Sequence, residues 1–243
     1  MTRWLLILLL LAATPASALA QWNDDAEQCR QLGASPADAA SDRRIEICTR
    51  AIESGDLTQK NLAATYNNRG TAYYSKGDLE RAIADFDKSL ELYPGYINAL
   101  MDRGMAYGMK GDQDRAVTDF TAAIDASPQL AGPYNGRCYS LALMGKAAAA
   151  IEDCNRALAL EPNTPYILDS RAYAYLRAGD FRRALADYDL ILQLEPQNAP
   201  ALYGRGLARL RLGHKEEGEH DLAAARAADT GIDAAMAKIG LAP

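Results

Sequence analysis

The chain has 243 residues, of which 49% are hydrophobic and 24% are charged, and its formal net charge at pH 7 is −6. Acidic and basic side chains alternate along it, whereas phosphate contacts need clustered Lys and Arg, so we expect no nucleic acid or anionic lipid partner. Its length suits either one continuous stack of repeats or two globular domains, and internal repeats favour the stack.

Residues 1–20 have the features of a secretory signal peptide. Arg3 precedes an apolar run from Trp4 to Ala13, and small residues at 18 and 20 provide a cleavage site. Polar residues and a proline interrupt the run after about ten residues, whereas a membrane anchor needs about 20. We therefore expect cleavage after Ala20, a mature chain without a membrane anchor, and a secreted or periplasmic location.

Residues 21–62 are interpreted as a degenerate N-terminal capping repeat. The segment 44–52 copies the pattern of a helix that recurs later in the chain, with Cys48 at the place that Phe86 takes in the next copy. A first helix is expected to include Ala26–Leu32, followed by a turn at 33–36 and by a long loop at 54–61. Terminal repeats are often irregular because one of their sides faces water.

Residues 63–232 form five tandem copies of a 34-residue unit, without insertion or deletion. Three series of residues stay in phase through all five copies, which chance does not explain. They are Arg69, Arg103, Arg137, Arg171 and Arg205; Gly77, Gly111, Gly145, Gly179 and Gly213; and Asp85, Asp119, Asp153, Asp187 and Asp221.

Each copy predicts two helices separated by the glycine of this series. A small residue such as Ala82 is followed four positions later by a larger one such as Phe86, which is the spacing of one helical face. Glycine suits the left-handed residue that ends the first helix, and proline cannot continue the second. The second helices accordingly end near Pro94, Pro128, Pro162 and Pro196. The fold class is therefore all-α.

The first copy resembles the tetratricopeptide repeat family through Gly70, Tyr73, Ala82, Phe86 and Pro94. The second copy matches as fully, with Gly104, Tyr107, Ala116, Phe120 and Pro128, whereas the later copies depart at some of these positions. The resemblance covers residues 63–232. It implies a right-handed α-solenoid of helix-turn-helix repeats whose concave face is lined by the first helices, and it implies no particular partner.

Four cysteines lie beyond the signal peptide, an even number that indicates disulfides in an oxidising compartment. Cys29 and Cys48 fall on the two helices of the capping repeat, so we expect a bond between them. Cys138 and Cys154 replace the small residue and the aromatic residue of the third copy, and they lie level across its turn. A bond between them would refill the volume of the lost ring.

The Arg and Asp series lie level across each turn, so ion pairs within or between repeats are expected. Five copies of one pair indicate a structural role, and exposed pairs contribute only about 0–1 kcal/mol each. The two histidines, His214 and His220, do not share a helical face, and no catalytic or phosphate-binding motif is present. We expect no enzymatic activity, no metal and no cofactor.

Residues 233–243 are expected to form a C-terminal capping helix and tail. Ile232, Met236 and Ile239 recur at helical spacing, so one side of this helix should cover the last repeat while Lys238 faces water.

The family resemblance places a partner-binding groove on the outward residues of the first helices. Tyrosine, methionine and asparagine combine large area, adaptable shape and hydrogen bonding to an extended backbone, which suits a peptide. We expect some of the rings to pack against neighbouring helices instead. The expected groove residues are Asn67, Thr71, Tyr74, Met101, Met105, Asn135, Tyr139, Asp169, Tyr173, Leu176, Tyr203 and Leu207.

The leading hypothesis is a non-enzymatic, exported scaffold that binds a segment of another protein, expected to belong to the cell envelope. The expected groove has no Lys or Arg, which argues against the carboxylate-binding subclass of tetratricopeptide proteins. The alternative is a module that binds an envelope glycan or small ligand, with Tyr139, Tyr173 and Tyr203 stacked on sugar rings.

Overall fold

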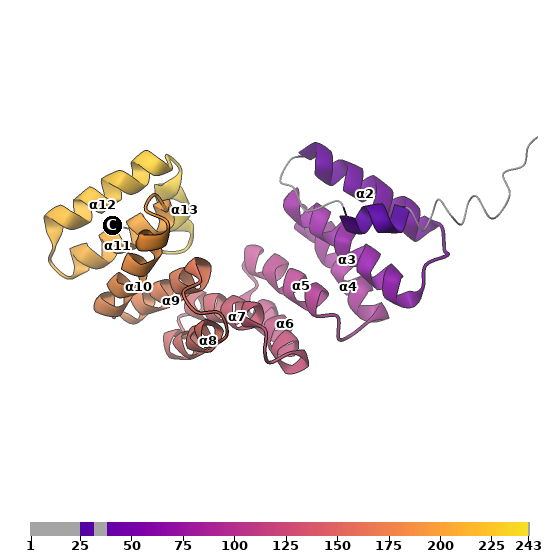
Figure 1. Cartoon of the computed structure of the whole chain (residues 1–243), viewed down its shortest axis with the longest axis horizontal. Helices are drawn as coiled ribbons and strands as arrows, with labels where there is room; N and C mark the ends of the chain where they lie inside the picture. Colours follow the sequence, from indigo (N-terminus) through magenta and orange to yellow (C-terminus); the bar gives the residue numbers. More distant parts are fainter. Residues whose placement is uncertain (1–24, 32–37, 243) are drawn as a thin grey trace, which may run out of the picture. The chain divides into compact units, whose positions relative to one another are not determined.

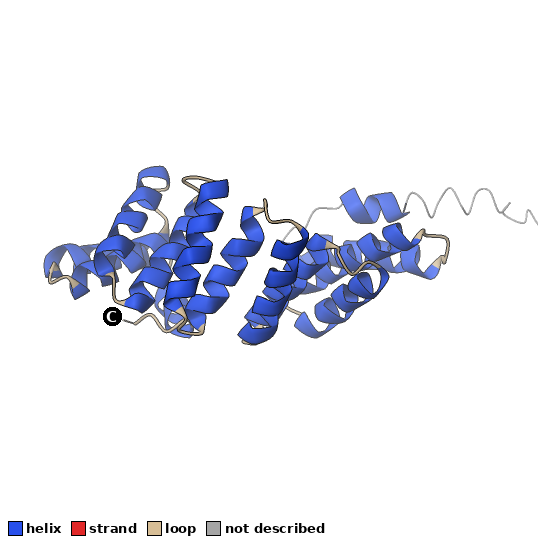
Figure 2. Ribbon diagram, turned by 90° about the horizontal axis from the view of Figure 1, so that it is seen from below, coloured by secondary structure: helices blue, strands red, loops and turns tan. Residues whose placement is uncertain are grey.

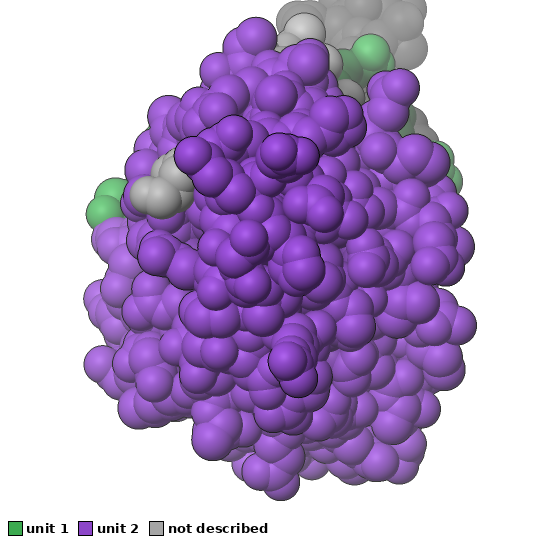
Figure 3. All heavy atoms as spheres, turned by 90° about the vertical axis from the view of Figure 1, so that its left-hand side faces the viewer, with its two compact units in different colours: residues 1–94 green, residues 95–243 purple. Residues whose placement is uncertain are grey.

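The computed structural model describes residues 25–31 and 38–242, and all regular structure in these ranges is helical (Figures 1 and 2). The predicted all-α fold of helix-turn-helix repeats is confirmed. The chain divides into two compact units, residues 1–94 and residues 95–243, coloured separately in Figure 3. The predicted signal peptide lies outside the described residues.

Unit 1 contains a helical segment at residues 25–31 and the helices α2 (Asp38–Glu53), α3 (Gln59–Ser75) and α4 (Leu79–Leu92). Helix α3 packs against both α2 and α4. The expected first helix of the capping repeat is helical over its described part, and its turn at 33–36 is not described. The loop after α2 is shorter than expected, because Thr58 accepts a hydrogen bond from the Asn61 amide and starts α3 at Gln59.

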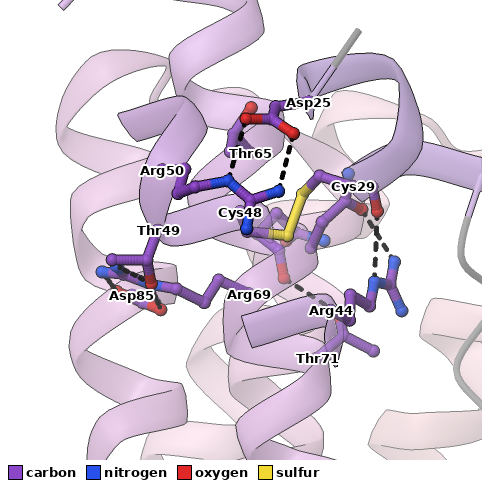
Figure 4. The surroundings of a disulfide bond; sticks show 12 residues. Asp25, Cys29, Arg44, Cys48, Thr49, Arg50, Thr65, Arg69, Thr71 and Asp85 are labelled. Atoms are coloured by element: carbon purple, nitrogen blue, oxygen red, sulfur yellow. Dashed lines mark hydrogen bonds and ion pairs between the residues drawn. A yellow bond between two sulfur atoms is a disulfide. The ribbon is translucent and has the colours of Figure 1, made fainter. Parts of the chain in front are cut away.

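A disulfide joins the helical segment 25–31 to α2 (Figure 4). It joins Cys29 to Cys48 with their Cα atoms 5.1 Å apart, as the sequence predicts. Beside it, the Arg50 guanidinium donates two hydrogen bonds to the Asp25 carboxylate, and Arg44 donates to the backbone carbonyl of Cys29. The short segment 25–31 is thereby fixed to α2 by a covalent bond, an ion pair and a backbone contact.

Unit 2 consists of four helix pairs and a short terminal helix. The pairs are α5 (Ile97–Met109) with α6 (Gln113–Ala126), α7 (Ala131–Leu143) with α8 (Ala147–Leu160), α9 (Pro165–Ala178) with α10 (Phe181–Leu194), and α11 (Ala199–Arg211) with α12 (Lys215–Ala228). The terminal helix is α13 (Ile232–Lys238), which contacts α11 and α12.

The turn between paired helices follows from a glycine and an aspartate. Gly77 has φ of +76°, and the amide of the next residue, Asp78, bonds back to the Tyr73 carbonyl, which closes the end of α3. The Asp78 carboxylate then accepts from the Arg81 amide and caps the start of α4. The same side-chain cap starts α6 and α10, whereas Lys146 and His214 start α8 and α12 without one.

Close packing within a pair depends on a small residue opposite a large one. A Cβ atom added to Gly70 would lie 2.6 Å from Cε1 of Phe86, so only glycine lets the ring lie against α3. Phe120 contacts glycines on both sides of it, since added Cβ atoms on Gly104 and Gly136 would lie 2.9 and 2.6 Å from its Cε1. The ring therefore joins its own first helix to the first helix of the next pair.

In the pair of α7 and α8, which is the third sequence copy, a disulfide takes the place of this contact. Cys138 on α7 and Cys154 on α8 are bonded, as the sequence predicts, and their Cα atoms are 5.5 Å apart. Both residues are fully buried, with Ala150 and Tyr173 in the same cluster. The bond takes the place in the core that the aromatic ring takes in the preceding pair.

Candidate functional site

The first helices of unit 2 form its inner face. Helix α7 contacts α5 and α9, and α9 also contacts α11, whereas α6, α8, α10 and α12 make no such contacts with one another. First helices therefore lie closer together than second helices, so this unit curves with α5, α7, α9 and α11 on the inside.

The expected groove residues differ in their exposure. Met105 on α5 is 40% exposed, while Met101, Asn135, Tyr139, Asp169 and Leu176 are partly covered. In unit 1, Thr71 and Tyr74 are also partly covered. The remaining four are buried, namely Asn67, Tyr173, Tyr203 and Leu207.

The expectation that these four residues face outward is wrong, for two physical reasons. Asn67 lies on α3, which is enclosed by α2 and α4. Tyr173, Tyr203 and Leu207 belong to the apolar clusters onto which the C-terminal residues fold. Helix α13 contacts α11, and burial together with the nearby Asp233 carboxylate of α13 raises the pKa of Tyr203.

Partly covered polar groups gather on α7 and α9. The Asn135 side-chain oxygen is buried and has no hydrogen-bond partner within the described residues. Asp169 forms no ion pair there either, and burial raises its pKa to about 6. Tyr139 lies with its ring centroid 5.6 Å from that of Tyr173, and burial raises its pKa to about 12. These acceptors can bind a donor such as a backbone N–H group.

The C-terminal residues lie beside this polar group. The Tyr173 hydroxyl donates a hydrogen bond of 2.7 Å to the backbone carbonyl of Ile239. Ile239 and Leu241 pack against the clusters that contain Tyr173 and Leu207. Residues 239 and 241 of the chain itself thus occupy part of the surface that the sequence analysis assigned to a partner.

A cavity of about 430 Å³ remains open next to these residues. It is bordered by Leu176 and Leu207 of the expected groove, by Arg177 and Arg211, and by residues 240–242. Two basic residues therefore lie beside expected groove residues at the ends of α9 and α11. Both arginines lie in the last turns of their helices. Arg177 directly follows Leu176, and Arg211 lies one helical turn after Leu207, so their spacing from expected groove residues could have indicated them from the sequence.

The Arg and Asp series forms five pairs of the same geometry. In each, Nε and Nη2 of the arginine donate to the two carboxylate oxygens over 2.6–2.8 Å. The aspartates of these pairs are buried and the arginine side chains are 17–23% exposed. These are shielded, bidentate pairs, so the value of about 0–1 kcal/mol for exposed pairs does not apply to them.

Four of these arginines also contact the second helix of the preceding pair. Nη1 of Arg69 donates to Thr49, that of Arg137 to Thr121 and that of Arg171 to Asn155. In the last pair, Arg205 Nη1 donates to Asp189. Each of these guanidiniums therefore binds two helices besides its own, which supports a structural role in setting the spacing of the repeats.

Family models of the tetratricopeptide repeat match residues 63–96, 97–130 and 170–242, which together are more than half of the chain. The chain belongs to the tetratricopeptide repeat family. Proteins of this family generally bind protein or peptide partners as scaffolds and are generally not enzymes. Among curated proteins, none matches this tetratricopeptide repeat protein significantly.

Solved structures of tetratricopeptide repeat proteins share the fold. A protein from Parabacteroides merdae has 15% sequence identity and a TM-score of 0.69, over 83% of this chain and 77% of that one. YrrB, described as a TPR protein with an unusual peptide-binding site, has 23% identity and a TM-score of 0.57, over 80% and 98%. PilW, a type IV pilus biogenesis factor, has 19% identity and a TM-score of 0.64, over 69% and 77%.

Two other features are missing from the residues that the structure describes. No group of three or more His, Cys, Asp or Glu side chains there could hold a metal ion. No helix in residues 25–31 and 38–242 combines the length and the apolar character needed to cross a bilayer.

Proposed function

We propose that the protein is an exported, non-enzymatic scaffold that binds an extended segment of a cell-envelope protein on the inner face of α5, α7, α9 and α11. The observation that supports this most directly is the buried side-chain oxygen of Asn135 on α7, which has no hydrogen-bond partner within the described residues. Asp169, at the equivalent position on α9, is partly covered and forms no ion pair in that part of the chain. A buried acceptor without a donor costs free energy, and a backbone amide of a bound segment would satisfy it.

Apolar contact would come from α5 and α7. Met105 is 40% exposed and Tyr139 is partly covered, so a partner side chain can reach both without any movement of the core. A flexible thioether beside a rigid ring suits a surface that accepts an irregular peptide side chain. The peptide-binding site named for YrrB supports a peptide as the kind of ligand.

Export is supported by the two disulfides, which persist in oxidising compartments. The proposed signal peptide and cleavage after Ala20 agree with that compartment. The burial of two tyrosines argues against the glycan alternative. Tyr173 and Tyr203 are 2% and 1% exposed, so neither offers a free ring face to a sugar.

Site-specific photo-crosslinking in cells tests this proposal. A benzoylphenylalanine at position 105 on α5 should capture one envelope protein through a short segment, and mass spectrometry should identify that segment. The matched control carries the same group in place of Thr118, which is exposed on the second helix of the same pair. Equal capture from both positions, or none from position 105, would contradict binding on the inner face.

The isolated partner segment then allows a quantitative test. Tyr139→Ala should weaken its binding about thirtyfold or more, because truncation of a central aromatic costs about 2 kcal/mol or more. Tyr166→Ala is the control, since this tyrosine is 52% exposed and lies at the start of α9. Calorimetry measures both, after circular dichroism has shown that each variant is helical.

A further inference from the structure

Residues 239–242 follow α13 and lie against the first helices α9 and α11. Ile239 and Leu241 contact the cluster that contains Cys138 of α7 and Tyr173 of α9, and they also contact the cluster that contains Leu207 of α11. The Tyr173 hydroxyl donates to the Ile239 carbonyl at 2.7 Å. Two apolar side chains and one backbone carbonyl are therefore recognised together, as in the binding of a peptide.

A glycine directs the segment onto this surface. Gly240 has φ of +77°, and the amide of Leu241 bonds back to the Met236 carbonyl at 2.9 Å, which closes the end of α13. A Cβ atom at position 240 would also lie 3.0 Å from Nη1 of Arg177. Another residue at this position would be strained in its backbone, and its Cβ would also require the end of the Arg177 side chain to shift, so the path of the segment depends on the glycine.

The segment leaves part of the site open. The cavity of about 430 Å³ beside residues 240–242 is bordered by Phe181 and by Arg177 and Arg211, and neither arginine forms an ion pair in the part of the chain that the structure describes. A second peptide segment can enter this space before the first one leaves.

We propose that residues 239–242 are an internal ligand of the inner face of α9 and α11, which a partner segment of the same chemistry must displace. That segment is short and apolar and offers a backbone carbonyl to the Tyr173 hydroxyl. Displacement rests on the proposed function, whereas the occupancy of the site by the chain's own residues does not.

A peptide-binding assay in solution tests the occupancy. The probe is a fluorescein-labelled synthetic peptide with residues 237–243, and fluorescence anisotropy compares the full chain with a chain that ends at Lys238 and keeps α13. A tethered segment competes at an effective concentration of about 1 mM, so the shortened chain should bind the peptide about tenfold more tightly if its own Kd for the peptide is about 0.1 mM, and by a larger factor if that Kd is lower.

Three variants separate occupancy of the site from a general loss of structure. Gly240→Ala, in the full chain, should release the segment and raise the affinity for the peptide towards that of the shortened chain. Tyr173→Phe, in the shortened chain, should weaken binding about fivefold through loss of one hydrogen bond. Tyr166→Phe removes a hydroxyl that bonds Glu161 instead, and it should leave binding unchanged.

Equal affinity of the full and shortened chains for the peptide would overturn the proposal, and so would the absence of binding by both up to millimolar peptide. If the shortened chain does not fold, Gly240→Ala decides the outcome alone, and unchanged binding by that variant would refute the proposal. A positive peptide assay with failed crosslinking at position 105 would remove the envelope partner and keep the internal ligand. The reverse result would remove only the internal ligand.

Discussion

At the scale of single residues, the arginines and aspartates show how position changes the strength of an ion pair. Arg137 and Asp153 have side-chain exposures of 23% and 10%, and the guanidinium also bonds Thr121. Arg115 and Asp112 form a pair of the same chemistry on one helix, with exposures of 59% and 31%. The first pair is removed from water and the second is not, so their contributions to stability should differ.

We expect Arg137→Ala to lower the free energy of unfolding by about 2–4 kcal/mol, because it leaves the Asp153 carboxylate buried without its partner. Arg115→Ala should cost only about 0–1 kcal/mol, apart from the stacking of this arginine on Tyr107. Urea denaturation followed by circular dichroism measures both variants. Similar losses for the two would show that shielding of the pair does not matter.

Asp169 should make stability depend on pH. Its folded pKa is raised to about 6 by burial, above the ordinary value of 3.8, so the protonated form is favoured in the folded state. Stability is fully retained below pH 3.8 and falls as the pH rises to about 6, where the folded carboxyl ionises. The tyrosines near it, Tyr139, Tyr173 and Tyr188, have raised pKa values and do not titrate in this range.

Asp169→Asn removes this dependence, because the amide is neutral at every pH. The gain in stability of the variant over the parent should grow by about 1 kcal/mol between pH 5 and pH 7.5. Urea denaturation at the two pH values measures it. Glu152→Gln on α8 is the control, since this residue is exposed and should show no such change. A constant difference between parent and Asp169→Asn would refute the role of burial.

At the scale of helix pairs, the pair of α7 and α8 fills its core with a disulfide where the preceding pair has an aromatic ring. Gly104, Phe120 and Gly136 fill the corresponding space in the preceding pair, where the ring lies between two glycines. Cys138 takes the place of Gly104 and Cys154 takes the place of Phe120. Ser170 takes the place of Gly136, and its carbonyl oxygen lies 4.0 Å from the Cys138 sulfur. A disulfide between small residues and a ring between glycines are thus alternative ways to fill one site.

The triple variant Cys138→Gly, Cys154→Phe, Ser170→Gly should therefore fold without the bond and keep its melting temperature under reducing conditions. The variant with alanine at both cysteine positions should lose about 3 kcal/mol, because it has neither the bond nor the ring. Calorimetry with and without dithiothreitol compares them. If both variants are equally destabilised, the ring does not replace the disulfide in this pair.

At the scale of the whole molecule, the export proposal predicts the covalent state of the protein in its compartment. The mature chain should begin at Gln21 and contain no free thiol, with Cys29 joined to Cys48 and Cys138 to Cys154. Intact-mass spectrometry and peptide mapping under non-reducing conditions test this on protein from the envelope fraction. Retention of residues 1–20, or free thiols in the folded protein, would contradict export to an oxidising compartment.

The sequence by itself determined the repeat, the helix pairs and the cysteine partners. These features depend on local rules, namely the spacing of small and large residues on a helix, the glycine of each turn, and the level position of two cysteines on either side of it. The expected outward face of the first helices followed from family resemblance alone, and for this reason it was incorrect at Tyr173, Tyr203 and Leu207.

Only the tertiary structure decided which residues are covered. Tyr173 and Ile239 are 66 positions apart, and no local pattern indicates that the hydroxyl of one binds the carbonyl of the other. The shielding of the Arg and Asp pairs likewise depends on helices of the preceding repeat. Burial is a property of everything that packs on a surface, so it follows from distant contacts, whereas helical periodicity is present in each short stretch of the chain.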